Sequence, residues 1–266
     1  MSKAAVRFAV FLLGLTTYAF SLIPLSSGDR LLFFGDRSVV HGSNPSGFLS
    51  IVESAVSKEN VTVIRAGRLD LVAADKLFDI YSLYNDVEPT VVIIMLGDIS
   101  SSGTVDEHVL LPQLEEFLAK VLTNNSRPPV RVALVSPVLA GEVVHDAQEE
   151  NYLDICSKLL SRLSLSMGLE YFDVRSPVLK YLEHENFENR ARGILTLDGI
   201  TLNSLGSCVL ARVFLTLLDS SKYFPTEMCS ISEMSTIIDG WTLDADRQYR
   251  FAISNKERVL SSSLEK

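Results

Sequence analysis

The stretch that decides the fold is Val91-Val92-Ile93-Ile94-Met95-Leu96, six consecutive apolar residues with no polar residue among them. A strand that is apolar on both faces has to be covered on both faces, as in a parallel sheet between two layers of helices. Similar short runs lie before and after it along the chain, at residues 30–34, 61–65, 130–135 and 169–174. The sequence therefore predicts five strands of one central sheet.

Longer segments between these runs carry apolar residues three or four positions apart, which is the spacing of amphipathic helices. They cover residues 72–83, 110–121, 153–163 and 204–218. Strands that alternate with helices predict a parallel sheet, and right-handed crossovers place helices on both of its faces. We therefore expect an α/β fold with three layers, α/β/α, around a mainly parallel five-stranded sheet.

The first 25 residues differ in composition from the rest of the chain. Lys3 and Arg7 precede an apolar run at residues 8–25, with the small residues Ala19 and Ser21 near its end. This pattern is typical of a secretory signal peptide, and the run is nearly long enough to remain as a signal anchor. We predict a secretory-pathway protein, lumenal, extracellular or membrane-anchored. A mitochondrial presequence is the alternative, although such segments are normally amphipathic with several arginines.

Two further features fit the secretory prediction. Asn60-Val61-Thr62 and Asn124-Asn125-Ser126 match the acceptor pattern for N-glycosylation, with Asn60 and Asn124 as the candidate residues. The chain has three cysteines, Cys156, Cys208 and Cys229. One Cys208–Cys229 bridge in an oxidising lumen and three unpaired thiols are both compatible with the sequence.

The totals limit the classes of function. A chain of 266 residues with a net charge of −9 is long enough for one substantial core and too acidic for a general nucleic-acid binder. We divide it into a signal segment (1–25), an α/β domain (29–222) and a C-terminal extension (223–266), of which residues 225–251 are expected to be ordered. The N-terminal segment and the extension are the parts through which we expect a protein partner or a membrane to be contacted.

Residues that follow the strands are the candidates for function, because ligands of parallel α/β sheets bind beyond the carboxyl ends of the strands. Three short loops qualify, and so does a later segment that precedes the last predicted helix. Their sequences are Gly35-Asp36-Arg37-Ser38, Ala66-Gly67-Arg68, Gly97-Asp98-Ile99-Ser100 and Asp198-Gly199-Ile200-Thr201-Leu202-Asn203.

These four segments, in this order, resemble the sequence blocks of the SGNH (GDSL-type) hydrolases, over about residues 30–220. The resemblance implies that family's fold, with layers like those of flavodoxin. It also implies a site for ester hydrolysis. In the family, a serine after Gly-Asp is the nucleophile, a Gly and an Asn form the oxyanion hole, and the His of Asp-x-x-His is the base.

The chain departs from this pattern at most of the catalytic positions. Arg37 stands at the position of the nucleophile, Ile99 at that of the oxyanion-hole Asn and Thr201 at that of the base, while Gly67 and Asp198 are retained. A guanidinium stays protonated and is neither nucleophile nor base, and threonine has no basic nitrogen. Losing one oxyanion donor alone costs about 10²–10³ in rate. We therefore expect a vestigial site formed by Asp36, Arg37, Ser38, Gly67, Asp198 and Thr201.

One route to activity stays open. Ser38 follows Arg37, and a shift of one residue would give a Gly-Asp-x-Ser elbow, which still requires a base. The four histidines are His41, His108, His145 and His184, and only His41 lies in the same loop. The main prediction is thus a non-catalytic binding or structural subunit. The alternative is an active ester or acetyl-glycan hydrolase that uses Ser38.

The arginines near the site suggest two further roles. Arg37, Arg65 and Arg68 could together hold a small anionic ligand. Alternatively, the site is a salt-bridged plug in which Arg37 pairs with Asp198, because a buried lone charge is costly. The sequence contains no pattern for a metal site or a cofactor.

Overall fold

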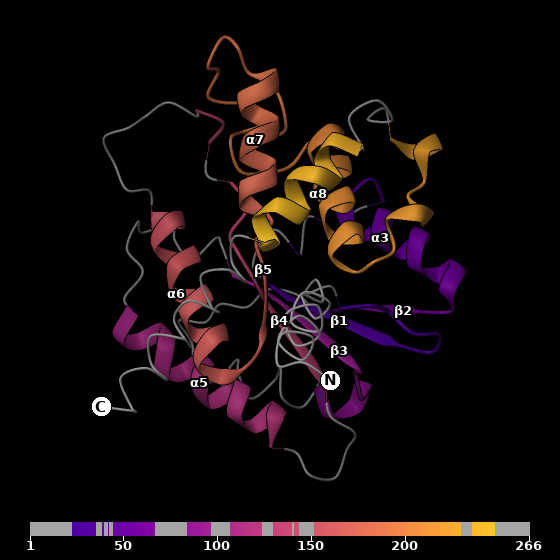
Figure 1. Ribbon diagram of the computed structural model, residues 1–266, viewed down its shortest axis with the longest axis vertical. Helices are drawn as coiled ribbons and strands as arrows, with labels where there is room; N and C mark the ends of the chain where they lie inside the picture. Colours follow the sequence, from indigo (N-terminus) through magenta and orange to yellow (C-terminus); the bar gives the residue numbers. More distant parts are fainter. Residues whose placement is uncertain are drawn as a thin grey trace, which may run out of the picture.

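The computed structural model describes residues 23–35, 39, 42, 45–66, 84–96, 107–123, 130–139, 141–143, 152–229 and 236–247. Within this part of the chain, five strands form one sheet in the order β2-β1-β3-β4-β5 (Figure 1). The strands are β1 (Arg30–Gly35), β2 (Thr62–Ala66), β3 (Val91–Met95), β4 (Arg131–Val135) and β5 (Glu170–Phe172). Every neighbouring pair is parallel. The predicted five-stranded α/β fold is confirmed.

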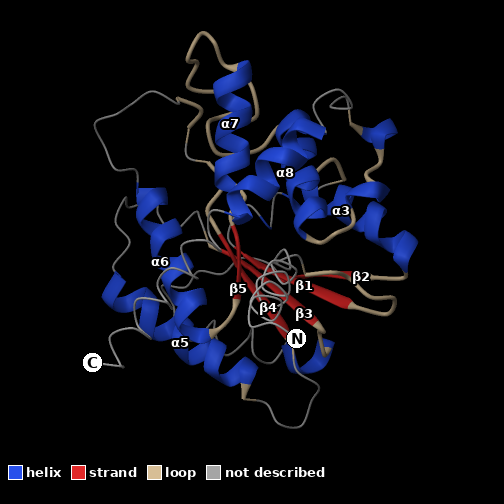
Figure 2. Cartoon of the chain, in the orientation of Figure 1, coloured by secondary structure: helices blue, strands red, loops and turns tan. Residues whose placement is uncertain are grey.

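Helices cover both faces of the sheet, so the three layers are present (Figure 2). One face packs against α3 (Phe48–Val56), α7 (Arg175–Glu185) and α8 (Ser204–Leu217). The other face packs against α5 (Glu107–Leu122) and α6 (Tyr152–Met167). Successive side chains of a strand point to opposite faces. In β1, Leu31 and Phe33 therefore enter the first core, and Leu32 and Phe34 enter the second.

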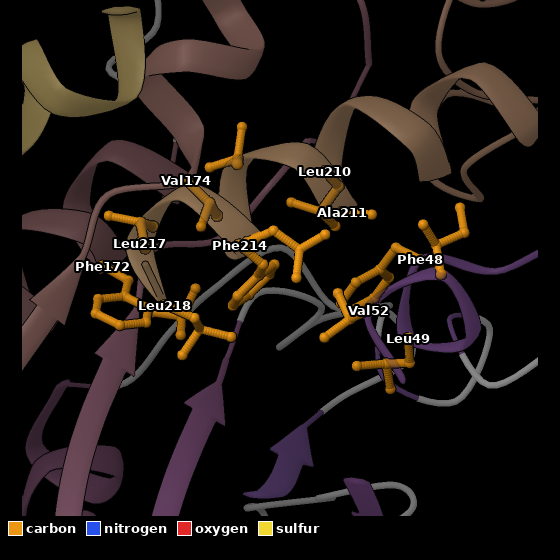
Figure 3. Packing of buried hydrophobic residues seen from close by; sticks show 14 of the residues in the cluster. Phe48, Leu49, Val52, Phe172, Val174, Leu210, Ala211, Phe214, Leu217 and Leu218 are labelled. Atoms are coloured by element: carbon orange, nitrogen blue, oxygen red, sulfur yellow. The ribbon is translucent and has the colours of Figure 1, made fainter. Parts of the chain in front are cut away.

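Phe214 of α8 is the centre of the first core (Figure 3). Its ring lies 5.5 Å from the ring of Phe48 in α3 and 5.6 Å from that of Phe33 in β1, measured between centroids. Phe172 of β5 is a third neighbour, at 6.5 Å. One residue of α8 thus joins the edge strand β5, the inner strand β1 and helix α3.

The predicted helix at residues 72–83 lies outside the described part of the chain, and the other three match α5, α6 and α8. Three helices of the described part were not predicted, namely α3, α7 and a helix at residues 236–247. At the N-cap of α3 stands Gly47, which has no side chain to signal the start, whereas Asp173 at the start of α7 accepts the N–H of Ser176 at 3.0 Å, a signal that the prediction missed. The last strand is shorter than predicted because the hydroxyl of Ser136 accepts the N–H groups of Val174 and Arg175, which starts α7.

Part of the C-terminal extension packs on α8. A helix at residues 236–247 places Ile238 in the first core. Its Asp239 receives the guanidinium of Arg212, with Nε at 2.7 Å and Nη2 at 2.5 Å, and the hydroxyl of Thr216 at 2.6 Å. Of the two alternatives for the cysteines, the bridge is present, because Cys208 in α8 is bonded to Cys229 and Cys156 is a buried thiol. No helix in the described part of the chain is long and apolar enough to span a bilayer.

Candidate functional site

The carboxyl ends of three strands lie side by side at one edge of the sheet. Phe34 is paired with Ala66, and Gly35 is paired with Met95, so the segments after β1, β2 and β3 leave the sheet at neighbouring points. Most residues of these segments lie outside the described part of the chain, namely Asp36, Arg37, Ser38, Gly67, Arg68, Gly97, Asp98, Ile99 and Ser100. The fourth predicted segment, residues 198–203, is described completely, so the geometry of the candidate site is known from this segment.

Asp198 closes a tight turn onto Thr201. One carboxylate oxygen accepts the N–H of Ile200 at 2.9 Å and the N–H of Thr201 at 2.6 Å, and the other accepts the Thr201 hydroxyl at 3.0 Å. These bonds lower the pKa of Asp198 from 3.8, with the Thr201 N–H as the largest cause and the Ile200 N–H next. The carboxylate is exposed and ionised, and its described partners are two and three residues away.

This geometry bears on the Arg37–Asp198 pair proposed from the sequence. Arg37 lies outside the described residues, so the pair itself stays a prediction. A lone carboxylate is costly only where it is buried, and Asp198 is exposed. Desolvation therefore gives Asp198 no need of a guanidinium partner.

Glu142 holds the segment that leads into the turn. Only 1% of this residue is exposed. One carboxylate oxygen accepts the N–H of Ile194 at 2.8 Å, and the other accepts the N–H of Leu195 at 2.8 Å together with the N–H and hydroxyl of Thr196, both at 2.5 Å. A buried carboxylate needs such donors, because charge-assisted hydrogen bonds replace its lost hydration. The four donors satisfy Glu142 and fix the chain just before Asp198.

The backbone around Glu142 reinforces this attachment. The Glu142 carbonyl accepts from Nδ2 of Asn186 at 2.9 Å, and its N–H donates to Ala191 O at 3.1 Å. The N–H of Gly141 donates to Gly199 O at 2.7 Å, inside the Asp198 turn. The segment that follows β4 thus holds the turn at the carboxyl edge of the sheet.

The start of α8 holds the turn from its other side. Asn203 caps the helix, accepting the N–H of Gly206 at 2.9 Å, and its Nδ2 donates to Ile194 O at 3.0 Å. Gly206 packs so closely on Leu195 that a Cβ at this position would collide with the Leu195 carbonyl oxygen. The retained Asp-Gly-Ile-x-Leu-Asn sequence therefore has a backbone and packing role that does not depend on catalysis.

Only one of the three anion-binding candidates is described. Arg65 in β2 forms an ion pair through Nη2 with Glu53 of α3, and the same nitrogen lies 3.5 Å from the hydroxyl of Ser50. This guanidinium is already neutralised by a carboxylate. Arg37 and Arg68 lie outside the described residues, so the anion pocket stays a prediction.

One imidazole is described, that of His184 near the end of α7. Its Nδ1 lies 2.8 Å from Glu185, and its ring centroid is 6.3 Å from that of Trp241 in the C-terminal helix. These contacts place it against the extension. His41 and His145, and the side chain of His108, lie outside the described residues, so Ser38 and its base stay untested.

Exposed apolar side chains surround the Asp198 turn. Leu197 and Ile200 flank Asp198 in the turn itself, and they are 67% and 44% exposed. Val143 follows Glu142, and Phe187 follows Asn186, so both adjoin the bonds that hold the turn. The loop that bonds to Glu142 also exposes the ion pair of Arg190 with Glu188, so the surface around the turn combines apolar and charged side chains.

Sequence reasoning missed Glu142, the residue with most contacts to the site segment. The only signal was an isolated acidic residue within the apolar stretch at residues 137–144. Neither a motif nor a period marks it, because its four donors lie 52 to 54 residues further along the chain. No group of three or more metal-ligating side chains occurs among the described residues.

Comparison with known proteins gives structural matches only. No family model and no curated protein matches the sequence. Among solved structures, the acetyl xylan esterase AlAXEase superposes with a TM-score of 0.56 at 25% identity, covering 68% of this chain and 96% of the esterase. LAE5, an α/β hydrolase from the metagenome of Lake Arreo in Spain, gives a TM-score of 0.58 at 19% identity and covers 75% and 99%.

A third match is a catalytic mutant of Axe2, an acetylxylan esterase from Geobacillus stearothermophilus. Its TM-score is 0.52 at 18% identity, with coverage of 73% of this chain and 95% of Axe2. At such identities the last two matches show the fold alone. Together with the all-parallel sheet and the described fourth segment, the matches show that this chain has an SGNH-like α/β fold and is structurally similar to acetyl xylan esterases.

Proposed function

We propose that this protein is a non-catalytic SGNH-hydrolase-like protein that serves as a binding or structural subunit. The observation that carries the proposal is the Asp198 turn. The mechanism that the resemblance implies needs a base at the position of Thr201, and here a threonine hydroxyl donates a hydrogen bond to the Asp198 carboxylate. Such a hydroxyl has no basic lone pair to activate a serine at neutral pH.

The framework around the turn supports the same proposal. Glu142, Asn203 and Gly206 maintain the backbone of the segment although the base is replaced. The exposed Leu197 and Ile200 give this surface the apolar area that a protein contact uses.

The alternative, an ester or acetyl-glycan hydrolase that uses Ser38, has one observation in its favour. The chain superposes on acetyl xylan esterases over about two thirds of its length. Fold similarity by itself does not establish activity, since one fold hosts many functions. The two proposals differ in a measurable way.

Hydrolysis of acetylated xylo-oligosaccharides and of 4-nitrophenyl acetate tests them. We expect the full-length protein and its Ser38→Ala variant to release acetate at the same background rate. Turnover by the wild-type protein that Ser38→Ala abolishes would overturn the non-catalytic proposal. The triple variant Arg37→Ser, Ile99→Asn, Thr201→His is a matched positive control, because it restores the family's nucleophile, oxyanion donor and base.

We further propose that the protein belongs to the secretory pathway, in preference to the mitochondrial alternative. Two described features support this address. The Cys208–Cys229 bridge is of a kind that persists in oxidising compartments. Asn60 is exposed in a left-handed conformation (φ 60°) after a short 3₁₀ turn, and Thr62 of the acceptor pattern is exposed as well. Asn124 lies outside the described residues.

Glycosidase treatment of protein from secreting eukaryotic cells tests this address. Thr62→Ala removes the Asn60 acceptor pattern without changing the turn, and Thr62→Ser keeps it. We expect the alanine variant to lose one glycan and the serine variant to retain it. If glycosidase treatment changes the mass of none of the three proteins, the proposed address is contradicted.

The proposed partner is a protein or a membrane, contacted through the N-terminal segment, the C-terminal extension or the apolar turn. A small anionic ligand remains the secondary proposal, and the ion pair of Arg65 with Glu53 leaves Arg37 and Arg68 to bind it. Co-purification after chemical cross-linking, with Leu197→Asp as the variant, tests the turn. Equal recovery of the same partner by both proteins would exclude the turn as its contact.

A further inference from the structure

Residues 23–25 belong to the folded domain. Ile23 is 3% exposed and lies in the core that α3, α7 and α8 share. Its N–H donates to the carbonyl of Leu217, the last residue of α8, at 3.2 Å. The last carbonyls of a helix have no donor within the helix. Ile23 therefore both fills the core and satisfies the end of α8.

The next two residues are attached as well. The carbonyl of Pro24 accepts Nη1 of Arg131 at 2.6 Å, while Nη2 of the same guanidinium donates to Asp29 at 2.6 Å. Leu25 packs against the same core as Ile23. Arg131, at the start of β4, thus binds both Pro24 and Asp29 of the segment before β1.

These contacts limit where a leader can end. The composition of the sequence predicts a boundary after residue 25, and a cut there would remove Ile23, Pro24 and Leu25. The loss would open a cavity in the core and leave the Leu217 carbonyl and Nη1 of Arg131 without these partners. A leader that is compatible with the fold has to end before Ile23.

We propose that the leader is removed by hydrolysis of the Ser21–Leu22 peptide bond. Water adds across this bond, so that Ser21 carries the new carboxylate of the leader and Leu22 carries the new amino group of the mature chain. Ala19 and Ser21 supply the small residues at the third and first positions before the bond that signal cleavage requires. The cut leaves one residue in front of Ile23. This inference rests on the proposed secretory address.

The test is the N-terminus of the full-length chain expressed in secreting eukaryotic cells, determined by intact mass and N-terminal sequencing. We expect Leu22. An N-terminus at Pro24 or later would overturn both the bond and the structural argument, and any other cleaved N-terminus would overturn the assigned bond. An intact N-terminus would overturn the cleavage and indicate an uncleaved segment.

Two leucine substitutions make the test specific. Ser21→Leu places a large residue directly before the bond and is expected to abolish the Leu22 terminus. Ser26→Leu is the matched control at an exposed position inside the mature chain, and it is expected to leave the Leu22 terminus unchanged. Retention of the Leu22 terminus by Ser21→Leu would overturn the proposal.

The glycan at Asn60 separates the failure of this inference from the failure of the proposed address. An intact N-terminus on a chain that carries the Asn60 glycan overturns the cleavage alone. An intact N-terminus on a chain without that glycan overturns the secretory address as well. The hydrolysis assay is independent of both results.

Discussion

Asp29 and Asp198 lie at opposite ends of the sheet, and both have a lowered pKa for different reasons. Asp29 is buried before β1, and it accepts the Thr90 hydroxyl, the Ser26 N–H and the Arg131 guanidinium, each at 2.6 Å. Burial raises its pKa, but these three donors together outweigh burial and bring it below 3.8. Asp198 is exposed, and the N–H groups of its own turn lower its pKa.

The difference lies in how far along the chain the partners are. Asp29 joins β1 to residues 61 and 102 positions away, so its bonds form only when the sheet forms. The Asp198 carboxylate binds residues two and three positions away, so its own bonds are local, whereas the backbone of its turn is held by Gly141 through Gly199. A lowered pKa thus indicates a tertiary contact at one end and a local turn at the other.

The largest expected effect comes from Glu142, the buried carboxylate that holds the segment before Asp198. Glu142→Leu leaves three N–H groups and one hydroxyl without an acceptor, so we expect the free energy of unfolding to fall by about 3–5 kcal/mol. Urea unfolding followed by circular dichroism measures it. Glu142→Gln, which keeps the volume and one acceptor oxygen, is the control and is expected to lose less. If the free energy of unfolding of the leucine variant fell by less than about 1 kcal/mol, residues 194–196 would keep their conformation without Glu142.

Asp29→Ala tests the amino end directly. The substitution leaves Arg131 and Thr90 without their buried acceptor, and we expect a loss of about 2–4 kcal/mol, reduced from the value for a fully buried pair because Arg131 is partly exposed. The same unfolding experiment applies. An unchanged midpoint of urea unfolding would show that the Asp29 contacts do not stabilise the fold. The contrast between a tertiary contact at Asp29 and a local turn at Asp198 would then fail.

The pH dependence of stability sharpens the contrast. The folded pKa of Asp29 is depressed, so its contribution is present above the unfolded value of about 3.8 and is lost as pH falls through the folded pKa. We expect unfolding free energy to decrease below about pH 4 in the wild-type protein, and this decrease to be smaller in Asp29→Asn. Solvent screens Asp198, so Asp198→Asn is expected to follow the wild-type curve closely. The opposite ranking of the two variants would contradict the assignment.

The smallest expected effect is that of the turn itself. Thr201→Val removes the hydroxyl that donates to Asp198 but keeps the shape of the side chain, and we expect a change in unfolding free energy of about 0.5 kcal/mol or less. Equilibrium unfolding of the two proteins side by side measures it. A loss of about 2 kcal/mol or more would make the turn a structural element, and its exposure would then no longer indicate a binding role.

The positions of the strands followed from the sequence because burial on both faces leaves a direct trace. Residues of β3 are apolar at every position, and each of them is buried. The strand ends agreed within one or two residues in all five cases. The order β2-β1-β3-β4-β5 was not predicted, because right-handed connections fix on which face a helix lies and leave open which strands are neighbours.

The helices α3 and α7 were decided by tertiary packing. Phe48, Leu49 and Val52 of α3 are held against α8, and this contact compensates for a short helix with β-branched residues and no capping side chain. In α7, the first N–H groups are satisfied by Ser136, which follows a different strand. The Ser136 partner cannot be read from the neighbouring residues, whereas Asp173, which accepts the N–H of Ser176, could have been.

For the candidate site, the sequence by itself determined which residue types stand after three of the strands and in the segment before α8, and therefore that a threonine, Thr201, stands where the resemblance places a base. Only the tertiary structure decided that Asp198 is exposed, that Glu142 carries the segment before it, and that Ile23 belongs to the core. The physical reason is the same in each case. A pattern of residue types reports local geometry and average burial, whereas hydrogen bonds across 50 or more residues depend on how the layers meet.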